Sequence, residues 1–222
     1  VAPRDMAALA AGSSSATLHE AAAAAALGSR DFAAAAEHYA AALRIDGAPK
    51  RRADLLRARF LNGDITGDEL AAGFSGLLSY DIGALAALRY AEEGKKARAA
   101  GTLSCSMQIC IRYAGGMRHV SGAGERALLS ALRAEGAAKC VNNLTGLISQ
   151  LPAARGGPLL AGLRRNFTDL IEPASLLALY EAGNKDDYRC SADGASCLPN
   201  PAWNGPAVCR GILPPAQKTA GK

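Results

Sequence analysis

Hydrophobic and polar positions along much of this chain recur with the period of an α-helix. The clearest case is residues 158–172, where apolar side chains return every three or four positions and share one helix face, while Arg164 and Arg165 face away. Pro158 suits the first turn of this helix and Pro173 ends it. The apolar face comprises Leu159, Leu160, Leu163, Phe167, Leu170 and Ile171.

Two other helix starts carry the pattern of a capping box, at Thr17–Glu20 and Thr66–Glu69. In this box the Thr hydroxyl and the Glu carboxylate bind amides that the first helical turn leaves open. Gly28, Gly47 and Gly63 are stop signals. The segment 103–113 fits a short helix or an irregular stretch equally well. The pattern predicts helices over 17–28, 31–45, 50–61, 67–78, 81–100, about 121–135, 158–172 and 174–182.

The composition supports a helical class. Alanine contributes 50 of the 222 residues, and 31 of these alanines lie in the first hundred positions, whereas aromatic residues make up 5%. Alanine favours helix and lets helix axes approach closely, while strands need the β-branched and aromatic residues that are scarce here. We therefore predict an all-α fold, either an antiparallel helical bundle or a short helical-repeat array.

The composition changes after residue 183. Five of the ten prolines, three of the six cysteines and the single tryptophan fall in the last forty residues. A segment of this kind needs cross-links to hold it on a folded body. We therefore predict an N-terminal extension over 1–16, a helical domain over 17–183, and a disulfide-stapled irregular segment over 184–222, with 217–222 frayed.

The cysteines indicate the compartment. An even number without metal-ligand spacing is typical of a disulfide framework, which forms outside the reducing cytosol. Since the last forty residues carry three cysteines, at least one must pair with the helical domain, and the remaining pairings stay open. The predicted location is therefore an organelle lumen, the intermembrane space, the periplasm or the exterior of the cell. The predicted disulfide residues are Cys105, Cys110, Cys140, Cys190, Cys197 and Cys209.

Residues 17–78 resemble tetratricopeptide-repeat hairpins. The offsets of the second helix of such a repeat are matched at Phe32, Ala35, Tyr39, Ala42, Leu43, Ile45 and Asp46, and Leu56 and Phe60 continue the phase into the next first helix. The preceding first helix departs from the repeat, with His19, Ala22, Ala23 and Ala26 at its defining positions. The resemblance implies a concave surface that binds another protein, and it implies no catalysis.

Charge and hydropathy argue against two classes of partner, nucleic acids and the membrane interior. The net charge of +5 is spread over short basic groups such as Lys50–Arg52 and Arg164–Arg165, not along one aromatic-interleaved face, so we expect no nucleic-acid binding. No apolar stretch reaches the ~20 residues that a transmembrane helix needs. The chain begins at Val1, and we expect a targeting segment to have been removed.

The sequence contains no clear catalytic or metal-binding motif. His19, His38 and His119 lack the one-turn spacing of a helical zinc site, and we interpret each as a half-exposed helical histidine. The glycine turn before His119 could place an anion at a helix start, although a plain connection is the simpler interpretation. Glu92–Glu93 and Asp186–Asp187 are interpreted as solvated surfaces. We assign no catalytic, cofactor-binding or metal-binding residue and expect no cofactor.

Asn143 and Asn166 each begin an N-glycosylation triplet, which is used only on a eukaryotic secretory route. They are the possible glycosylation sites.

The favoured function is non-enzymatic. We expect an interaction or accessory subunit of an extracytoplasmic, membrane-associated protein assembly, with other protein subunits as partners. Two alternatives stay open: a secreted helical enzyme whose site is assembled from several helices, and a secreted recognition glycoprotein. A pocket of converging arginines and carboxylates favours the enzyme, and a glycan on Asn143 or Asn166 favours the glycoprotein.

Overall fold

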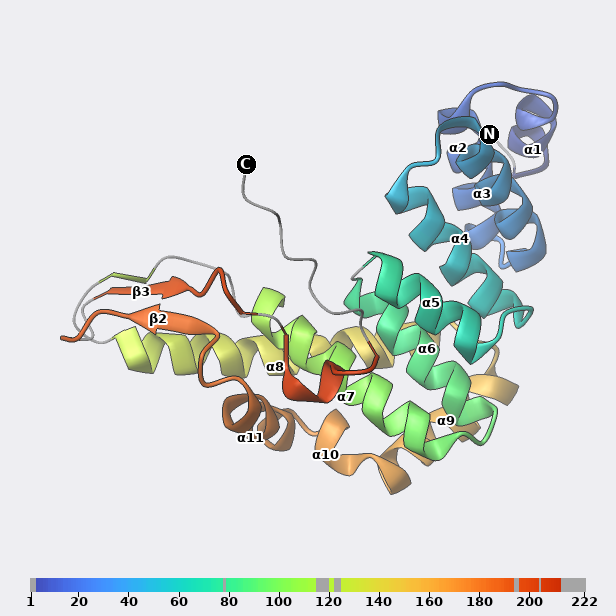
Figure 1. The fold of residues 1–222 in the computed structure, drawn as a ribbon. Coiled ribbons are helices and arrows are strands. Elements are labelled where there is room, and N and C mark those ends of the chain that lie inside the picture. The colour runs from blue at the N-terminus through green and yellow to red at the C-terminus, as the bar shows by residue number, and fades with distance from the viewer. Residues whose placement is uncertain are drawn as a thin grey trace. The chain divides into compact units, whose positions relative to one another are not determined.

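The computed structural model describes residues 3–77, 79–114, 120–121, 125–193, 196–203 and 205–212, and these residues are mostly helical (Figure 1). The helices are α1 (Pro3–Ala10), α2 (Ala16–Gly28), α3 (Phe32–Asp46), α4 (Pro49–Asn62), α5 (Gly67–Leu77), α6 (Tyr80–Glu92), α7 (Lys96–Ala114), α8 (Glu125–Ser149), α9 (Ala153–Asn166), α10 (Thr168–Ile171) and α11 (Pro173–Gly183). The strands are β1 (Val120–Ser121), β2 (Tyr188–Cys190) and β3 (Ser196–Pro199), and a 3₁₀ turn η1 spans Ala207–Cys209. The predicted helical class is confirmed.

The contacts divide the chain into two compact units, 1–89 and 90–222, with the boundary inside α6. The boundaries expected after residues 16 and 183 divide the chain by composition, and they remain a prediction.

The N-terminal unit consists of consecutive helices that pack as antiparallel hairpins, α1 on α2, α2 on α3 and α3 on α4. Alanine side chains line these contacts, and their small size lets the helix axes approach closely. Tyr39 adds bulk, and Leu27 and Leu55 pack against the cluster from its edge. The expected helical hairpins are therefore present. The buried alanines of this core are Ala23, Ala26, Ala35, Ala36 and Ala58.

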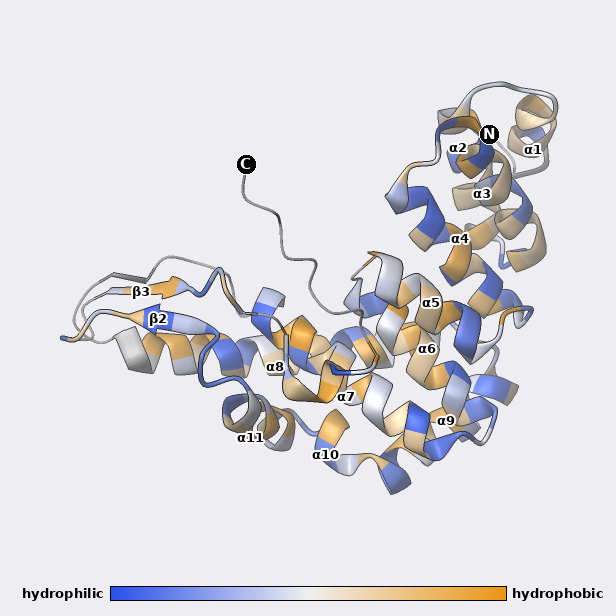
Figure 2. Cartoon of the chain, viewed as in Figure 1, coloured by the Kyte–Doolittle hydropathy of each residue, from blue (hydrophilic) through white to orange (hydrophobic). Residues whose placement is uncertain are grey.

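Hydrophobic and hydrophilic residues are mixed along most helices (Figure 2), as expected where one helix face is buried and the other is solvated. Among the described residues, no helix combines the length and the apolar character needed to cross a membrane.

One of the two predicted capping boxes is present and the other is wrong. Glu69 N donates to Thr66 Oγ1 at 3.2 Å, and Thr66 N donates to Glu69 Oε2 at 2.9 Å, which is the reciprocal pair expected. At α2 the cap is Ser15, whose backbone is extended and whose Oγ accepts from Leu18 N at 3.3 Å. Thr17 already lies inside the first turn, and so it cannot act as the cap.

The long helix predicted over 81–100 is wrong, because the chain turns at Gly94. This glycine adopts φ +74°, a left-handed conformation that favours glycine, and Lys95 N returns to Tyr90 O at 2.8 Å. The expected break near Gly101 is also wrong, since α7 runs through it. Residues 103–113 are accordingly helical, and the buried face of α7 carries Cys105 and Cys110.

Two further helices begin and end at other residues than predicted. The helix expected over about 121–135 spans Glu125–Ser149, and Ser121 belongs to β1. The helix expected over 158–172 begins at Ala153 after Pro152, which places Pro158 in its interior, and it ends before Phe167. Of the predicted apolar face, Leu159, Leu163 and Leu170 are buried and the other three members are half-buried, while both arginines are exposed.

In the C-terminal unit, α7 packs on α8, and α11 contacts both (Figure 1). The segment after α11 is less irregular than expected, because its strands β2 and β3 pair. β1, which precedes α8, joins them in a small antiparallel sheet of order β1–β3–β2. Cys190 lies opposite Cys197 in the β2–β3 register. Leu129 of α8 packs against Tyr188 and Cys197 and so anchors the sheet on the helix.

A candidate binding hollow in the C-terminal segment

All six cysteines are paired, as predicted. Cys105–Cys209 joins α7 to η1, Cys110–Cys140 joins α7 to α8, and Cys190–Cys197 joins β2 to β3. The first bond satisfies the expectation that at least one cysteine of the last segment binds the helical domain. Three disulfides indicate an oxidising, extracytoplasmic compartment.

The segment after α11 folds around a hollow of about 450 Å³, which we call the C-terminal hollow. Its walls come from the end of α11, from β2, and from the turns between residues 200 and 210. The volume lies within the range of natural ligand pockets. The charged and aromatic side chains that line it are Lys185, Asp186, Tyr188, Arg189, Trp203 and Arg210.

Asn184 fixes the orientation of the tryptophan in this wall. Its buried side-chain amide donates to Gln108 Oε1 at 2.8 Å and to Tyr180 O at 3.0 Å. The amide oxygen accepts from the indole Nε1 of Trp203 at 3.3 Å. Since Asn184 is the C-cap of α11 and Gln108 lies in α7, two helices hold the indole in place.

Arg112 of α7 supports the same indole. Its guanidinium carbon lies 4.0 Å from the centre of the Trp203 ring, and its Nη2 donates to Asn200 O at 3.2 Å. A cation this close to an indole face is attracted by the ring quadrupole, and the attraction is stronger because Arg112 is buried. Trp203 is therefore held through both its ring and its N–H group.

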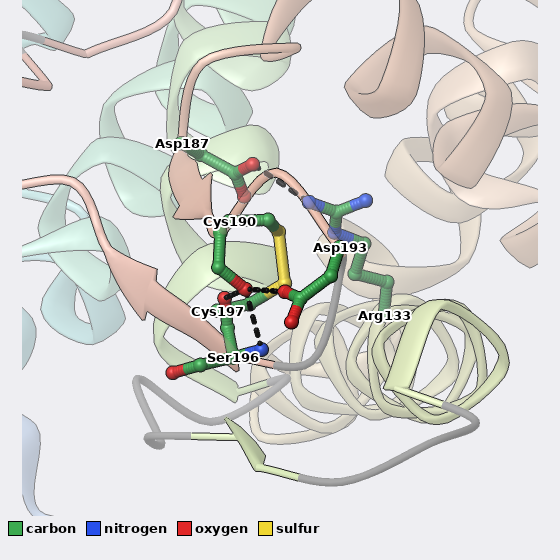
Figure 3. Close-up of a disulfide and its surroundings, with 7 residues drawn as sticks. Arg133, Asp187, Cys190, Asp193, Ser196 and Cys197 are labelled. Atoms are coloured by element: carbon green, nitrogen blue, oxygen red, sulfur yellow. Dashed lines mark hydrogen bonds and ion pairs between the residues drawn. A yellow bond between two sulfur atoms is a disulfide. The ribbon is translucent and has the colours of Figure 1, made fainter.

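Asp187 ties the segment to α8 and α11. Its fully buried carboxylate accepts from Arg133 Nη2 at 2.7 Å (Figure 3) and from the Tyr180 hydroxyl. Burial, together with the hydrogen bond to Asp187, raises the pKa of the Tyr180 phenol well above its ordinary value. The expected solvated surface at Asp186–Asp187 is correct for the exposed Asp186 and wrong for Asp187.

The disulfide-closed end of the β2–β3 hairpin is also fixed by hydrogen bonds (Figure 3). Ser191 N donates to Ser196 O at 2.8 Å, and Ser196 N donates to Ser191 Oγ at 3.0 Å. The Ser191 hydroxyl also contacts Asp193 Oδ1 at 2.5 Å. Arg189 therefore projects from a strand that both a covalent bond and a hydrogen-bond ladder hold in place.

Three cations of the hollow are free of ion-pair partners among the described residues, as are some of the helix cations such as Arg164 and Arg165, while other helix cations are paired. Within the part of the chain that the structure describes, Lys185, Arg189 and Arg210 are exposed and make no ion pair or side-chain hydrogen bond. By contrast, Arg51 pairs with Glu20 and Asp46. The hollow thus presents three cations to solvent, and a negatively charged ligand is what such an arrangement can bind.

A second hollow of about 380 Å³, which we call the α9 hollow, lies between the end of α6, the start of α7, and α9. Arg155 and Glu92 form a bidentate ion pair at its wall, with Nε–Oε1 at 2.9 Å and Nη2–Oε2 at 3.0 Å. The expected solvated surface at Glu92–Glu93 is present only in part, because both residues are half-buried. Lys96 and Phe167 complete the lining that carries charge or aromatic character.

The structure brings two of the three histidines together. His19 Nδ1 and His38 Nδ1 are 3.2 Å apart, and His19 Nε2 lies 3.2 Å from Ser13 O. His19 is buried, so its expected half-exposed position is wrong. Burial, and secondarily the charge of His19, lowers the pKa of His38, while Glu37 opposes the shift.

His119 and the glycine turn before it lie outside the described residues. Among the residues described, no group of three or more His, Cys, Asp or Glu side chains is placed to hold a metal ion.

Both predicted glycosylation sites lie on helices, Asn143 within α8 and Asn166 at the end of α9, and both are exposed. Asn166 Nδ2 donates to Gly162 O at 2.9 Å, and Asn166 lines the α9 hollow. Their glycosylation remains a prediction.

The residues of the C-terminal hollow match no sequence motif and were not predicted as a site. The signal was the single tryptophan among turn residues between two cysteines, followed by Arg210 directly after Cys209. Comparisons of the chain with protein-family models, with curated proteins and with solved structures found no match.

Proposed function

We propose that this chain is a non-enzymatic interaction subunit of an extracytoplasmic protein assembly, and that it contacts its partner through the C-terminal hollow. The observation that carries this proposal is the combination of Trp203, Tyr188, Arg189 and Arg210 in one hollow. Tryptophan, tyrosine and arginine are the residues that supply most of the binding energy at protein interfaces.

The cross-links around the hollow support the same role. Arg189 directly precedes Cys190, and Arg210 directly follows Cys209, so each arginine is attached to a disulfide-bonded residue. A site held in its binding conformation loses less conformational entropy when the partner docks. The lumenal, intermembrane-space or periplasmic side of a membrane complex is the setting we propose.

The helical hairpins of the N-terminal unit offer a second surface. We propose that α2, α3 and α4 are tetratricopeptide-like, since Ala35, Tyr39 and Ala42 are buried at the positions that the resemblance uses for packing. Such hairpins would bind a further protein segment and leave the C-terminal hollow for another partner.

An enzymatic role is the second candidate, and the α9 hollow is the observation that favours it. Arg155 and Glu92 converge there beside Lys96, as a site assembled from several helices requires. The support is weaker than for the interaction role, because the guanidinium and the carboxylate bind each other. Asn166 lines the same hollow, where a glycan would support the recognition-glycoprotein alternative instead.

The test is purification from the native source under mild conditions, followed by size-exclusion chromatography with mass determination. We expect the chain to elute together with a partner at a mass well above its own 22.7 kDa. Elution as an isolated chain of 22.7 kDa under these conditions would contradict the interaction role.

A further inference from the structure

We infer that the C-terminal hollow receives an acidic segment of the partner protein, whose carboxylates bind Lys185, Arg189 and Arg210. This inference rests on the proposed function and specifies the chemistry of the partner. It starts from the charge of the lining, where three cations face a single carboxylate, that of Asp186.

The layer beneath the hollow adds to this imbalance. It holds two arginines, Arg112 and Arg133, and the buried carboxylate of Asp187, which binds Arg133. Arg112 bears on Trp203 and on the backbone of Asn200, both of which line the hollow. A concave surface with an excess of one charge concentrates ligands of the opposite charge.

The two arginines suit carboxylates in particular. A guanidinium presents a planar fork of N–H donors that matches the two oxygens of a carboxylate, and such charge-assisted pairs are about twice as strong as neutral hydrogen bonds. Arg189 stands on a strand closed by Cys190–Cys197, and Arg210 stands beside the Cys105–Cys209 bond. The positions of their backbones are therefore set before a ligand arrives.

The surroundings favour a protein segment over other polyanions. Trp203 and Tyr188 offer apolar contact to side chains that flank the carboxylates, and a hollow of about 450 Å³ holds only a few residues. Asp186 lies among the cations and can accept a hydrogen bond from a backbone amide, whereas it repels a continuous run of phosphates. An anionic membrane surface would engage a flat basic patch more readily than a hollow.

Trp203 provides the measurement, because it is the only tryptophan of the chain and it lines the hollow. The oxidised full chain is titrated with an end-blocked hexapeptide of alternating glutamate and glycine while tryptophan fluorescence is recorded. We expect a saturable change that weakens as the salt concentration rises. A peptide with glutamine in place of glutamate should give no saturable change.

Variants assign the binding to individual cations. Each of Arg189→Gln and Arg210→Gln should weaken the glutamate peptide about tenfold or more, because one charge-assisted hydrogen bond contributes that much. The matched control is Arg164→Gln with Arg165→Gln, which removes two exposed charges of α9 and should leave the affinity unchanged. Circular dichroism and a thiol count confirm that each variant is folded and oxidised.

Three results would overturn the inference. The first is equal binding of the glutamine peptide, and the second is an equal loss of affinity in the control variant. The third is a fluorescence response to a short DNA or to phosphatidylglycerol vesicles with none to the glutamate peptide.

The inference and the proposed function fail in different experiments. A native complex that forms equally well with the Arg189→Gln, Arg210→Gln double variant would refute the acidic segment and leave the interaction role intact. A wild-type chain that elutes alone would refute the interaction role itself.

Discussion

Asp187 holds several elements of the C-terminal unit together through one side chain. Its carboxylate binds Arg133 of α8 and the hydroxyl of Tyr180 of α11, while its backbone oxygen accepts from Asn200 N at 2.8 Å. A buried ion pair contributes little compared with apolar packing, but removing one partner leaves the other charge uncompensated. The cost of a substitution should therefore be large at this position.

We expect Asp187→Asn to lower the free energy of unfolding by about 3 kcal/mol, as for other broken buried ion pairs. Urea unfolding followed by circular dichroism measures this change. The neighbouring exposed Asp186→Asn is the control and should change stability by no more than about 0.5 kcal/mol. Equal effects of the two substitutions would show that the contacts of Asp187 are not structural.

The lowered pKa of His38 makes the stability of the chain depend on pH. Because the pKa of His38 is lower in the folded chain than its ordinary value of 6.5, the unfolded chain binds more protons below that pH. Stability should therefore be lost as the pH falls from about 6.5 toward the folded pKa. Thermal unfolding between pH 8 and pH 5 should show this loss, and His38→Gln should reduce it. An identical pH profile in the variant would contradict the assignment.

At the scale of the elements, small residues let the helices of the N-terminal unit approach one another closely. There is no room for a side chain at Gly83 of α6. A Cβ there would lie 2.9 Å from ring atoms of Phe74, which is fully buried in α5. Gly76 of α5 is exposed, and a Cβ there would meet nothing within 4 Å. The two helical glycines should therefore respond to alanine in opposite directions.

We expect Gly83→Ala to destabilise the chain by about 1–3 kcal/mol through overpacking against Phe74. Gly76→Ala should stabilise it by about 0.5–1 kcal/mol, since alanine restricts the unfolded chain and favours helix. Chemical denaturation of both variants measures the difference. Stabilisation by both substitutions would mean that α5 and α6 do not pack as closely as described.

Helix existence could be predicted from the sequence, while several boundaries could not. The period of Leu159, Leu163 and Leu170 identifies a buried face wherever the helix begins. The turn at Gly94 is harder, because an isolated glycine in a helical pattern is either tolerated or left-handed, and tertiary packing decides which. The cap at Ser15 shows the same limit, since two neighbouring hydroxyl residues can each serve as a cap.

The C-terminal hollow was predictable only in part, because its contacts join residues that are far apart in the sequence. Oxidised cysteines follow from their number and from the absence of metal-ligand spacing. The burial of Asp187 does not follow from its neighbours, because Arg133 and Tyr180 reach it from 54 and 7 residues away. The convergence of Lys185, Arg189 and Arg210 likewise depends on how the turns after α11 fold.

For the molecule as a whole, the three disulfides constrain the chain over very different separations. Cys105–Cys209 spans 104 residues, and Cys190–Cys197 spans 7. In the chain-entropy description, a longer closed loop restricts the unfolded state more strongly. The bond that ties η1 to α7 should therefore contribute more to stability than the bond within the hairpin.

Replacing Cys105 and Cys209 together by alanine should lower the free energy of unfolding by about 4.7 kcal/mol, against about 2.4 kcal/mol for Cys190 and Cys197. Guanidinium unfolding of the two double variants tests the order. A larger loss for the hairpin pair would contradict the view that η1 is held mainly by its covalent bond to α7.

The fixed walls of the C-terminal hollow depend on the disulfides that hold the last segment, and peptide mapping of unreduced protein by mass spectrometry tests these bonds most directly. We predict three cross-linked peptide pairs, joining Cys105 with Cys209, Cys110 with Cys140, and Cys190 with Cys197. Free thiols, or a different pairing of Cys209 or Cys190, would contradict the account, because the walls that carry Arg210 and Arg189 would then not be fixed as described.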